Sequence, residues 1–282
     1  MTVSPALTLS AQTLIDALRL PEGCRVDQRV PKKLLLENGA PTAADKRLIT
    51  EAIEEIQWVA VLKPNTIGVP DYRDTLREYL EIAVLTVTVR GFVKPASHSR
   101  LAELVHRAVP YPVLLLLIEG QSLTLSLAHK RWAQNEAAKV VLDGSPISVT
   151  VSVTVSASLS EGHAAGSSHP DPAAVADAEN AFIQSLSVTR QPQATLHALY
   201  QGWVDCVQAL LAARLTGSYQ TPTTPEQAAK RRQALADCER LEAEVSRLRA
   251  QAAKEKQMAR QVELNLTLKR VQAELAAARR QL

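Results

Sequence analysis

Three glutamates and one lysine stand beside apolar runs in the way that the catalytic residues of metal-dependent nucleases stand beside strands. Glu78 and Glu81 begin one run, Glu119 ends a second, and Lys130 follows a third. Carboxylates that bind Mg²⁺ can activate a water molecule, and a neighbouring lysine can stabilise charge on a phosphate. The Asp…Glu-x-Lys spacing that suits this chemistry on one hairpin is absent. We therefore favour strand-end ion pairs and keep a divergent nuclease using Glu78, Glu81 and Lys130 as the alternative.

A second group of residues could contact nucleic acid. Lys32 and Lys33 follow a proline, and Lys130, Arg131 and Trp132 are consecutive after an alternating apolar run. Lysine and arginine bind phosphate, and tryptophan can stack on a base. The two clusters form one DNA-contact surface only if the fold brings them together, and solvated corners of the surface are the alternative.

The spacing of the histidines, cysteines and glycines does not indicate a metal or cofactor site. The six histidines lack HxH and HExxH spacing, the three cysteines lack CxxC spacing, and neither a P-loop nor a GxGxxG motif occurs. These absences predict no metal, no cofactor and no catalytic residue beyond the nuclease alternative. Three widely spaced cysteines also argue against a disulfide framework.

The same composition indicates a cytoplasmic protein. Unpaired cysteines fit a reducing compartment. The first residues lack the basic and apolar regions of a signal peptide. The longest apolar run, Val113–Ile118, is far shorter than the roughly 20 residues that span a bilayer. We therefore expect no membrane contact.

An α+β fold is predicted from the elements that must position these residues. The run Glu78–Arg90 is apolar on both faces and predicts a central strand. A helix over Ser97–Ala108 and a buried strand from Val113 follow, which suits a right-handed crossover. Residues 113–129 then predict a hairpin with its turn at Gly120, and residues 147–159 a further strand. With only 4% aromatic residues, the core of this mixed sheet must be aliphatic.

Three regions are predicted along the chain. Residues 1–159 hold the sheet and its flanking helices, residues 160–220 a Ser/Gly/His-rich loop and two helices, and residues 221–282 a long C-terminal coiled-coil helix. Thr224 and Pro225 have the cap-then-proline pattern of a helix start.

The C-terminal region carries two heptad seams, which are the residues expected to contact a partner. They are Leu241, Val245 and Leu248 in the first, and Leu264, Leu268, Val271 and Leu275 in the second. The seams do not share one register, so a shift falls between them. A continuous helix of about 55 residues would reach about 80 Å, wider than a domain of this size. We expect it to self-associate as a homo-oligomer, dock on another protein or fold back on its own domain.

Charge is distributed unevenly between this helix and the rest of the chain. Residues 221–282 contain 13 Lys and Arg against 8 Asp and Glu, whereas the whole chain has a net charge of +3. A basic helix on a mildly acidic body suits an anionic partner. A solvated helix of mixed charge is the alternative.

Several stretches together resemble a bacterial family known as domain-of-unknown-function family 4391. They include "VPKKLLLENG", "IQWVAVLKPNTIGVP", "EYLEIAVLTV", "HRAVPYPVLLLL", "LSLAHKRWAQNE", "LHALYQGWVDCVQALLAARLTGSY" and "KEKQMARQVELNLTLKR". The resemblance implies a companion of helicases and DNA methyltransferases in restriction-like, anti-phage gene sets, and it implies no catalytic residues. We therefore expect a non-catalytic accessory subunit that docks through its C-terminal region and could also contact DNA.

Overall fold

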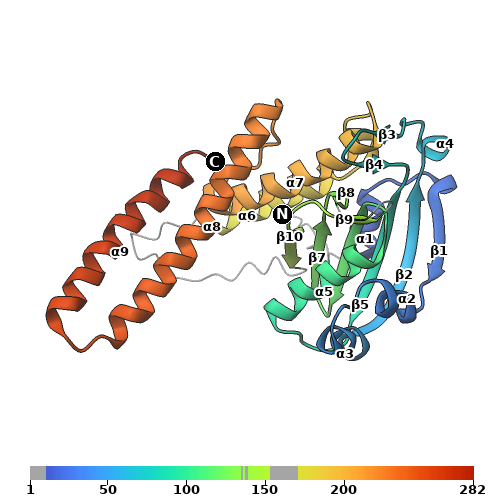
Figure 1. Cartoon of the computed structure of the whole chain (residues 1–282). Coiled ribbons are helices and arrows are strands. Elements are labelled where there is room, and N and C mark those ends of the chain that lie inside the picture. Colours follow the sequence, from blue (N-terminus) through green and yellow to red (C-terminus); the bar gives the residue numbers. More distant parts are fainter. Residues whose placement is uncertain (1–10, 135, 137–138, 153–170) are drawn as a thin grey trace, which may run out of the picture. The chain divides into compact units, whose positions relative to one another are not determined.

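The computed structural model describes residues 11–134, 136, 139–152 and 171–282 (Figure 1). The predicted α+β class is confirmed, with a mixed six-stranded sheet, flanking helices and a helical C-terminal part. The chain divides into two compact units. The sheet unit contains the strands together with residues 179–207, and the C-terminal unit contains residues 172–178 and 208–282. The predicted region 160–220 is therefore divided between the units, and its residues 160–170 lie outside the described residues.

The main sheet has the strand order β1-β2-β5-β6-β7-β10. Its strands are β1 (Arg25–Arg29), β2 (Ile53–Leu62), β5 (Ile82–Val89), β6 (Val113–Glu119), β7 (Ser122–Leu127) and β10 (Ile147–Ser152). Only β5 and β6 are parallel, and α5 (Pro95–Ala108) connects them. The predicted strand–helix–strand unit is confirmed, and β5 occupies an interior position with almost every residue buried.

The sequence-based strand over residues 78–90 is wrong in one respect. Residues Glu78–Tyr79 form a separate short strand, β4, which pairs with β3 (Tyr72–Arg73). The Asp74 carboxylate accepts hydrogen bonds from the backbone N–H groups of Leu76 and Arg77, both at 2.7 Å. This turn chemistry closes a local hairpin, so the chain enters the main sheet only at Ile82.

The predicted hairpin after β6 is confirmed. β6 and β7 pair antiparallel, and Gly120 takes a positive φ of 56° in the turn between them. β10 continues the antiparallel order against β7, with Val149 and Val151 buried. The remaining residues of that predicted strand, including Val153 and Val155, lie outside the described residues.

An aliphatic core fills one face of the sheet beneath α2 (Lys32–Asn38), α3 (Ala43–Ala52) and α5. Alternate residues of β5 and β6 point into this core, as the period of two requires. Thr42 caps α3 by accepting a hydrogen bond from the Asp45 backbone at 3.1 Å, an interaction for which threonine is well suited at a helix N-terminus. The Asp45 carboxylate then pairs with Arg100 of α5 at 2.8 Å, joining two of the covering helices.

Shorter elements complete the sheet unit. They are α1 (Ala11–Ala17), a 3-10 turn η1 (Glu22–Cys24), α4 (Pro64–Ile67), the strand pair β8 (Lys130–Trp132) and β9 (Val140–Leu142), and a second 3-10 turn η2 (Val188–Arg190). Two helices, α6 (Pro172–Ser185) and α7 (Leu196–Thr216), each contribute residues to both units. None of the described helices combines the length and hydropathy needed to cross a membrane.

The C-terminal region is a helical hairpin, so the prediction of one continuous helix is wrong. Helix α8 (Pro225–Lys254) begins at the predicted cap, where the Thr224 hydroxyl accepts from the Gln227 backbone. It ends at Glu255, and α9 (Met258–Arg279) runs back beside it (Figure 1). The Glu255 carboxylate accepts hydrogen bonds from the backbone N–H groups of Lys256 and Gln257, both at 2.9 Å. A side chain thus satisfies the backbone at the place where the two seams change register.

The two seams bury each other inside this hairpin. All seven residues predicted to contact a partner, Leu241, Val245, Leu248, Leu264, Leu268, Val271 and Leu275, pack in one cluster with Cys238 and Ala278. Arg279 and Glu242 form an ion pair between the helices at 2.8 Å. The seams therefore have a partner within the chain, which removes the premise that they need a second protein.

A seam substitution tests this arrangement. We expect Leu248→Ala to lower the free energy of unfolding of the hairpin by about 2 to 3 kcal/mol, because it leaves a cavity between α8 and α9. Chemical denaturation followed by circular dichroism would measure the loss, with exposed Arg249→Ala as the matched control. Within one chain, the transition should not move with protein concentration. A midpoint that rises with concentration would show instead that the seams pair between copies.

Candidate functional site

The residues of the nuclease alternative make separate interactions and do not converge. Glu78 forms an ion pair with Arg73 of the neighbouring strand, and Glu81 pairs with Lys63 at 3.0 Å. Glu119 accepts a hydrogen bond from the Val93 backbone at 2.5 Å. In the part of the chain that the structure describes, no three His, Cys, Asp or Glu side chains are grouped to hold a metal ion.

Lys130 is buried at the end of α5. Its side chain is 3% exposed, and its ammonium group donates to the backbone carbonyls of His106 and Val109. These carbonyls belong to the C-terminal end of α5, where a helix lacks internal donors and its dipole favours a cation. Burial lowers the pKa of Lys130 to about 7. Lys130 thus acts as a helix cap, and its side chain is withdrawn from the solvent where nucleic acid would bind.

Several residues of the predicted DNA-contact surface are engaged in contacts within the protein. Lys32 donates to the Ile53 carbonyl, and burial, followed by repulsion from Arg90 and Arg29, lowers its pKa. Lys33 is exposed and pairs with Glu37 at 3.6 Å. A hollow of about 330 Å³ beside Lys32 is also lined by Glu54 and Glu55, so its charge is mixed.

The rest of that surface is half-buried in local contacts. Arg131 pairs with Asp143 at 3.6 Å and donates to the Trp132 carbonyl at 3.2 Å. With Lys130 enclosed, the two predicted clusters contribute Lys33, Arg131 and Trp132 at most to a contact with DNA. That contact stays a prediction.

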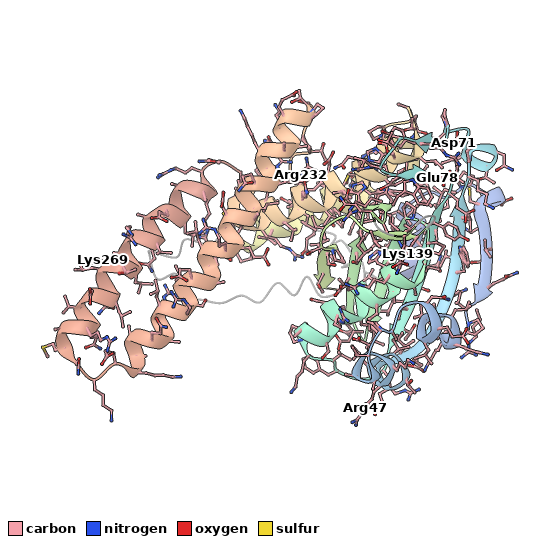
Figure 2. The ribbon with its side chains drawn as sticks, viewed as in Figure 1. Arg47, Asp71, Glu78, Lys139, Arg232 and Lys269 are labelled. Carbon is pink, nitrogen blue, oxygen red and sulfur yellow. The ribbon has the colours of Figure 1, made fainter. Side chains whose placement is uncertain are left out.

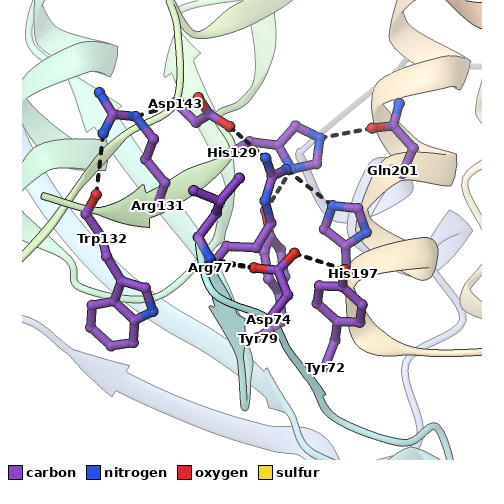
Figure 3. Close-up of polar contacts among 11 residues, drawn as sticks. Tyr72, Asp74, Arg77, Tyr79, His129, Arg131, Trp132, Asp143, His197 and Gln201 are labelled. Carbon is purple, nitrogen blue, oxygen red and sulfur yellow. Dashed lines mark hydrogen bonds and ion pairs between the residues drawn. The ribbon is translucent and has the colours of Figure 1, made fainter. Parts of the chain in front are cut away.

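A cluster of tyrosines and histidines, which sequence reasoning did not identify, brings several polar side chains of the sheet unit together (Figure 3). Its centre is His129, between Tyr79 of β4 and Gln201 of α7. The His129 Nδ1 atom lies 2.5 Å from the Tyr79 hydroxyl, and Nε2 lies 3.0 Å from the Gln201 side-chain oxygen. Because that oxygen only accepts, the ring carries its proton on Nε2 and accepts from Tyr79 through Nδ1.

A second imidazole extends the cluster towards the β3–β4 hairpin. His197 stacks on Tyr72 with ring centroids 4.9 Å apart and meets Tyr79 edge-on at the same distance. Arg77 approaches the His197 Nε2 atom at 3.4 Å and forms an ion pair with Asp143 at 3.1 Å. A guanidinium only donates, so His197 is also neutral, with its proton on Nδ1.

Burial keeps both rings uncharged. It lowers the pKa of His129 to about 4, with added repulsion from His197 and Arg77, and it lowers the pKa of His197 as well. The same burial raises the pKa of the Tyr79 phenol. The basic nitrogen of each ring is already occupied, by Tyr79 in one case and by Arg77 in the other. The cluster therefore lacks an open lone pair for general base catalysis, and it fastens the start of α7 to the sheet.

One sequence signal pointed towards this cluster. The chain has only five tyrosines and six histidines, and three of the tyrosines, Tyr72, Tyr79 and Tyr200, meet here with two of the histidines. A buried tyrosine usually places its hydroxyl group against a hydrogen-bond partner. In a chain with so few aromatic residues, the tyrosines therefore indicate where buried polar contacts can occur. The contacts join residues that are 50 or more positions apart, so no local sequence pattern reveals them.

The C-terminal unit offers a different kind of site. When α8 and α9 pack, Met258, Val262 and Leu266 of α9 remain 80%, 54% and 64% exposed. At 100° per residue they lie on the side of α9 opposite to Leu264 and Val271 of the seam. Three large apolar side chains in one exposed row are the pattern of a helix that has a further neighbour to bind.

A family model covers nearly the whole of this architecture. It matches residues 18–275, from the residue after α1 through α8 and most of α9, and its description is Domain of unknown function (DUF4391). The chain belongs to this family. The predicted resemblance is thereby confirmed. No curated protein and no solved structure matches the chain.

Membership of DUF4391 attaches no reaction to the residues described above. The match does include the His129 cluster, the Lys130 cap and most of the hairpin. In this DUF4391 chain, the exposed apolar row Met258, Val262 and Leu266 of α9 is the surface whose exposure and side-chain chemistry best suit binding.

The buried histidines of the sheet unit predict acid sensitivity. Burial, with repulsion from Lys130, lowers the pKa of His106 to about 3, and that of His129 falls to about 4. An unfolded histidine titrates near pH 6.5, so the unfolded state binds more protons below that pH. The contribution of the histidines to the free energy of unfolding should be level above about pH 6.5 and fall as the pH drops from about 6.5 to 4, by up to about 3 kcal/mol for His129.

Urea denaturation at a series of pH values would measure this slope. His129→Gln should reduce it, because the variant has no proton to gain in that window. Asp45→Asn is the matched control. Arg100 and Thr42 hold the pKa of Asp45 at about 2, so this pair should lose its contribution only below about pH 4. An unchanged slope in His129→Gln would contradict the assignment of a neutral ring to His129.

Proposed function

We propose that this chain is a non-catalytic accessory subunit of a cytoplasmic, bacterial anti-phage system that contains a helicase or a DNA methyltransferase. The family resemblance supplies the context of such systems. The single observation that supports a docking role is the exposed row Met258, Val262 and Leu266 on α9. The C-terminal hairpin is the docking element in this proposal.

The docking residues in this proposal lie on the exposed side of α9, and not in the seams as the sequence predicted. The seam residues Leu241 and Leu268 pack within the hairpin, so a partner could reach them only by opening it. The exposed row needs no such opening. Packing the seams first also stabilises α9 as a helix, which presents the row in a fixed geometry to a partner.

Chemistry offers less support for the nuclease alternative. Glu78, Glu81 and Lys130 have separate partners among the described residues, and Lys130 is enclosed. We therefore expect purified protein to leave plasmid DNA intact in the presence of Mg²⁺ or Mn²⁺, as followed by gel electrophoresis. Cleavage that Glu81→Ala abolishes would restore the nuclease.

Copurification tests the accessory role. The chain would be tagged and expressed together with the helicase and methyltransferase genes of its own locus. We expect the triple variant Met258→Gln, Val262→Gln and Leu266→Gln to recover at least about tenfold less of the partner, because three apolar contacts are lost. Glutamine is a good helix former, so α9 should persist, which circular dichroism would confirm.

A matched control separates docking from general stickiness. Leu34 and Phe92 of the sheet unit are 48% and 85% exposed. Leu34→Gln with Phe92→Gln removes exposed apolar surface elsewhere and should leave recovery of the partner unchanged. Equal recovery in all three proteins would contradict docking through α9.

A further inference from the structure

The exposed side of α9 continues beyond its apolar row into a line of positive charge. Lys269, Ala273 and Arg280 lie within about 40° of the direction of Val262 around the helix axis. We call Met258, Val262, Leu266, Lys269, Ala273 and Arg280 the outer face of α9, and all six are exposed. Figure 2 labels Lys269 on the side of α9 away from α8.

The two cations of this face are not neutralised by the described residues. Neither the Lys269 ammonium nor the Arg280 guanidinium has an ion-pair or side-chain hydrogen-bond partner there, and Arg280 is engaged only through its backbone N–H, which donates to Ala278. The nearest carboxylates on α9, Glu263 and Glu274, lie about 100° or more around the helix from Val262. Glu274 is in addition paired with Arg270 at 3.9 Å. The outer face is therefore apolar towards its N-terminal end, basic at Lys269 and Arg280 towards its C-terminal end, and free of carboxylates.

Neighbouring charges of the hairpin strengthen this bias. The turn between α8 and α9 adds Lys254 and Lys256, both exposed, close to the apolar end of the face. Only Glu255 opposes them there, and its carboxylate is engaged with the backbone of the turn. The charged side chains on and beside the face, Lys254, Lys256, Lys269 and Arg280, are therefore mainly positive, and a negatively charged surface would complement them.

From this charge and shape we propose that the outer face of α9 binds an acidic amphipathic helix of the partner protein. The face is a straight ridge of about 33 Å, which matches one helix of about 20 residues lying along it. Apolar residues of that helix would cover Val262 and Leu266, while its Asp and Glu side chains would pair with Lys269 and Arg280. The inference rests on the docking role proposed above and specifies what docks.

Two other occupants fit the face less well. A second copy of the chain would set Lys269 against Lys269 when the two faces align in full, and like charges oppose such an alignment. Nucleic acid would satisfy the cations but leave Met258, Val262 and Leu266 in water. An acidic helix satisfies both kinds of residue at once.

Peptide binding to the full-length protein tests the inference. The probe is a fluorescent peptide of about 20 residues with a leucine ridge flanked by glutamates. One control peptide replaces every glutamate with lysine, and the other keeps the acidic composition but contains two prolines that break the helix. We expect the acidic helical peptide to bind at least about tenfold more tightly than either control, as measured by fluorescence anisotropy. Its affinity should fall as NaCl rises from about 0.05 to 0.3 M.

One charge-reversal variant and a matched control test the contribution of charge to this binding. Lys269→Glu with Arg280→Glu should weaken the acidic peptide by about tenfold and relieve the discrimination against the lysine peptide. Lys230→Glu with Arg232→Glu is the matched control. It reverses two exposed cations near the start of α8 and should leave binding unchanged. Equal affinity for the acidic and lysine peptides would overturn the inference.

The remaining outcomes each decide between the proposals. Binding to vesicles that contain anionic lipid, without binding of the acidic peptide, would replace the partner helix with a lipid surface. In the copurification, release of the partner by the glutamine triple variant but not by Lys269→Glu with Arg280→Glu would retain the accessory role and reject the acidic helix. Retention of the partner by both variants would reject the docking role itself.

Discussion

The mutual burial of two aliphatic seams decides what the C-terminal unit can offer to other molecules. Helices α8 and α9 bury Leu241, Val245 and Leu248 against Leu264, Val271 and their neighbours. A hydrophobic seam left in water would be costly, and an intramolecular contact covers it without the translational and rotational entropy that a second chain would lose. The turn at Glu255 makes this pairing available. On α9, this pairing leaves Met258, Val262 and Leu266 exposed on the side opposite to the seam.

A comparable constraint applies in the sheet unit, where buried polar side chains are hydrogen-bonded to other parts of the same unit. Lys130 is committed to the last carbonyls of α5, and the His129 ring is committed on both nitrogens. A buried polar group that lacks a partner costs free energy, so these interactions are requirements of a core that contains few aromatic residues. Residues whose types suggest catalysis in the sequence therefore serve as caps and fasteners in the fold.

Local and periodic signals in the sequence predicted much of the fold. The apolar pattern located β5, α5 and β6, and the caps at Thr42 and Thr224 stand where residue type places them. The break between α8 and α9 was harder to predict because it contains neither glycine nor proline. A register shift was visible there, but whether the helix kinks, continues or reverses depends on the Glu255 carboxylate and on the seams that can then pair.

The interactions of the candidate site residues escaped prediction for a related reason. Sequence neighbours such as Lys130 and Arg131 suggested one basic surface, yet β8 alternates sides, so Lys130 points into the protein and Arg131 outwards. The contact of His129 with Gln201 joins residues 72 positions apart, which no local pattern encodes. The outer face of α9 was hidden differently: its residues stand beside the seam in sequence and opposite to it in space. The seam identifies which side of α9 packs against α8, and the opposite side carries the exposed apolar residues on which the proposed docking role rests.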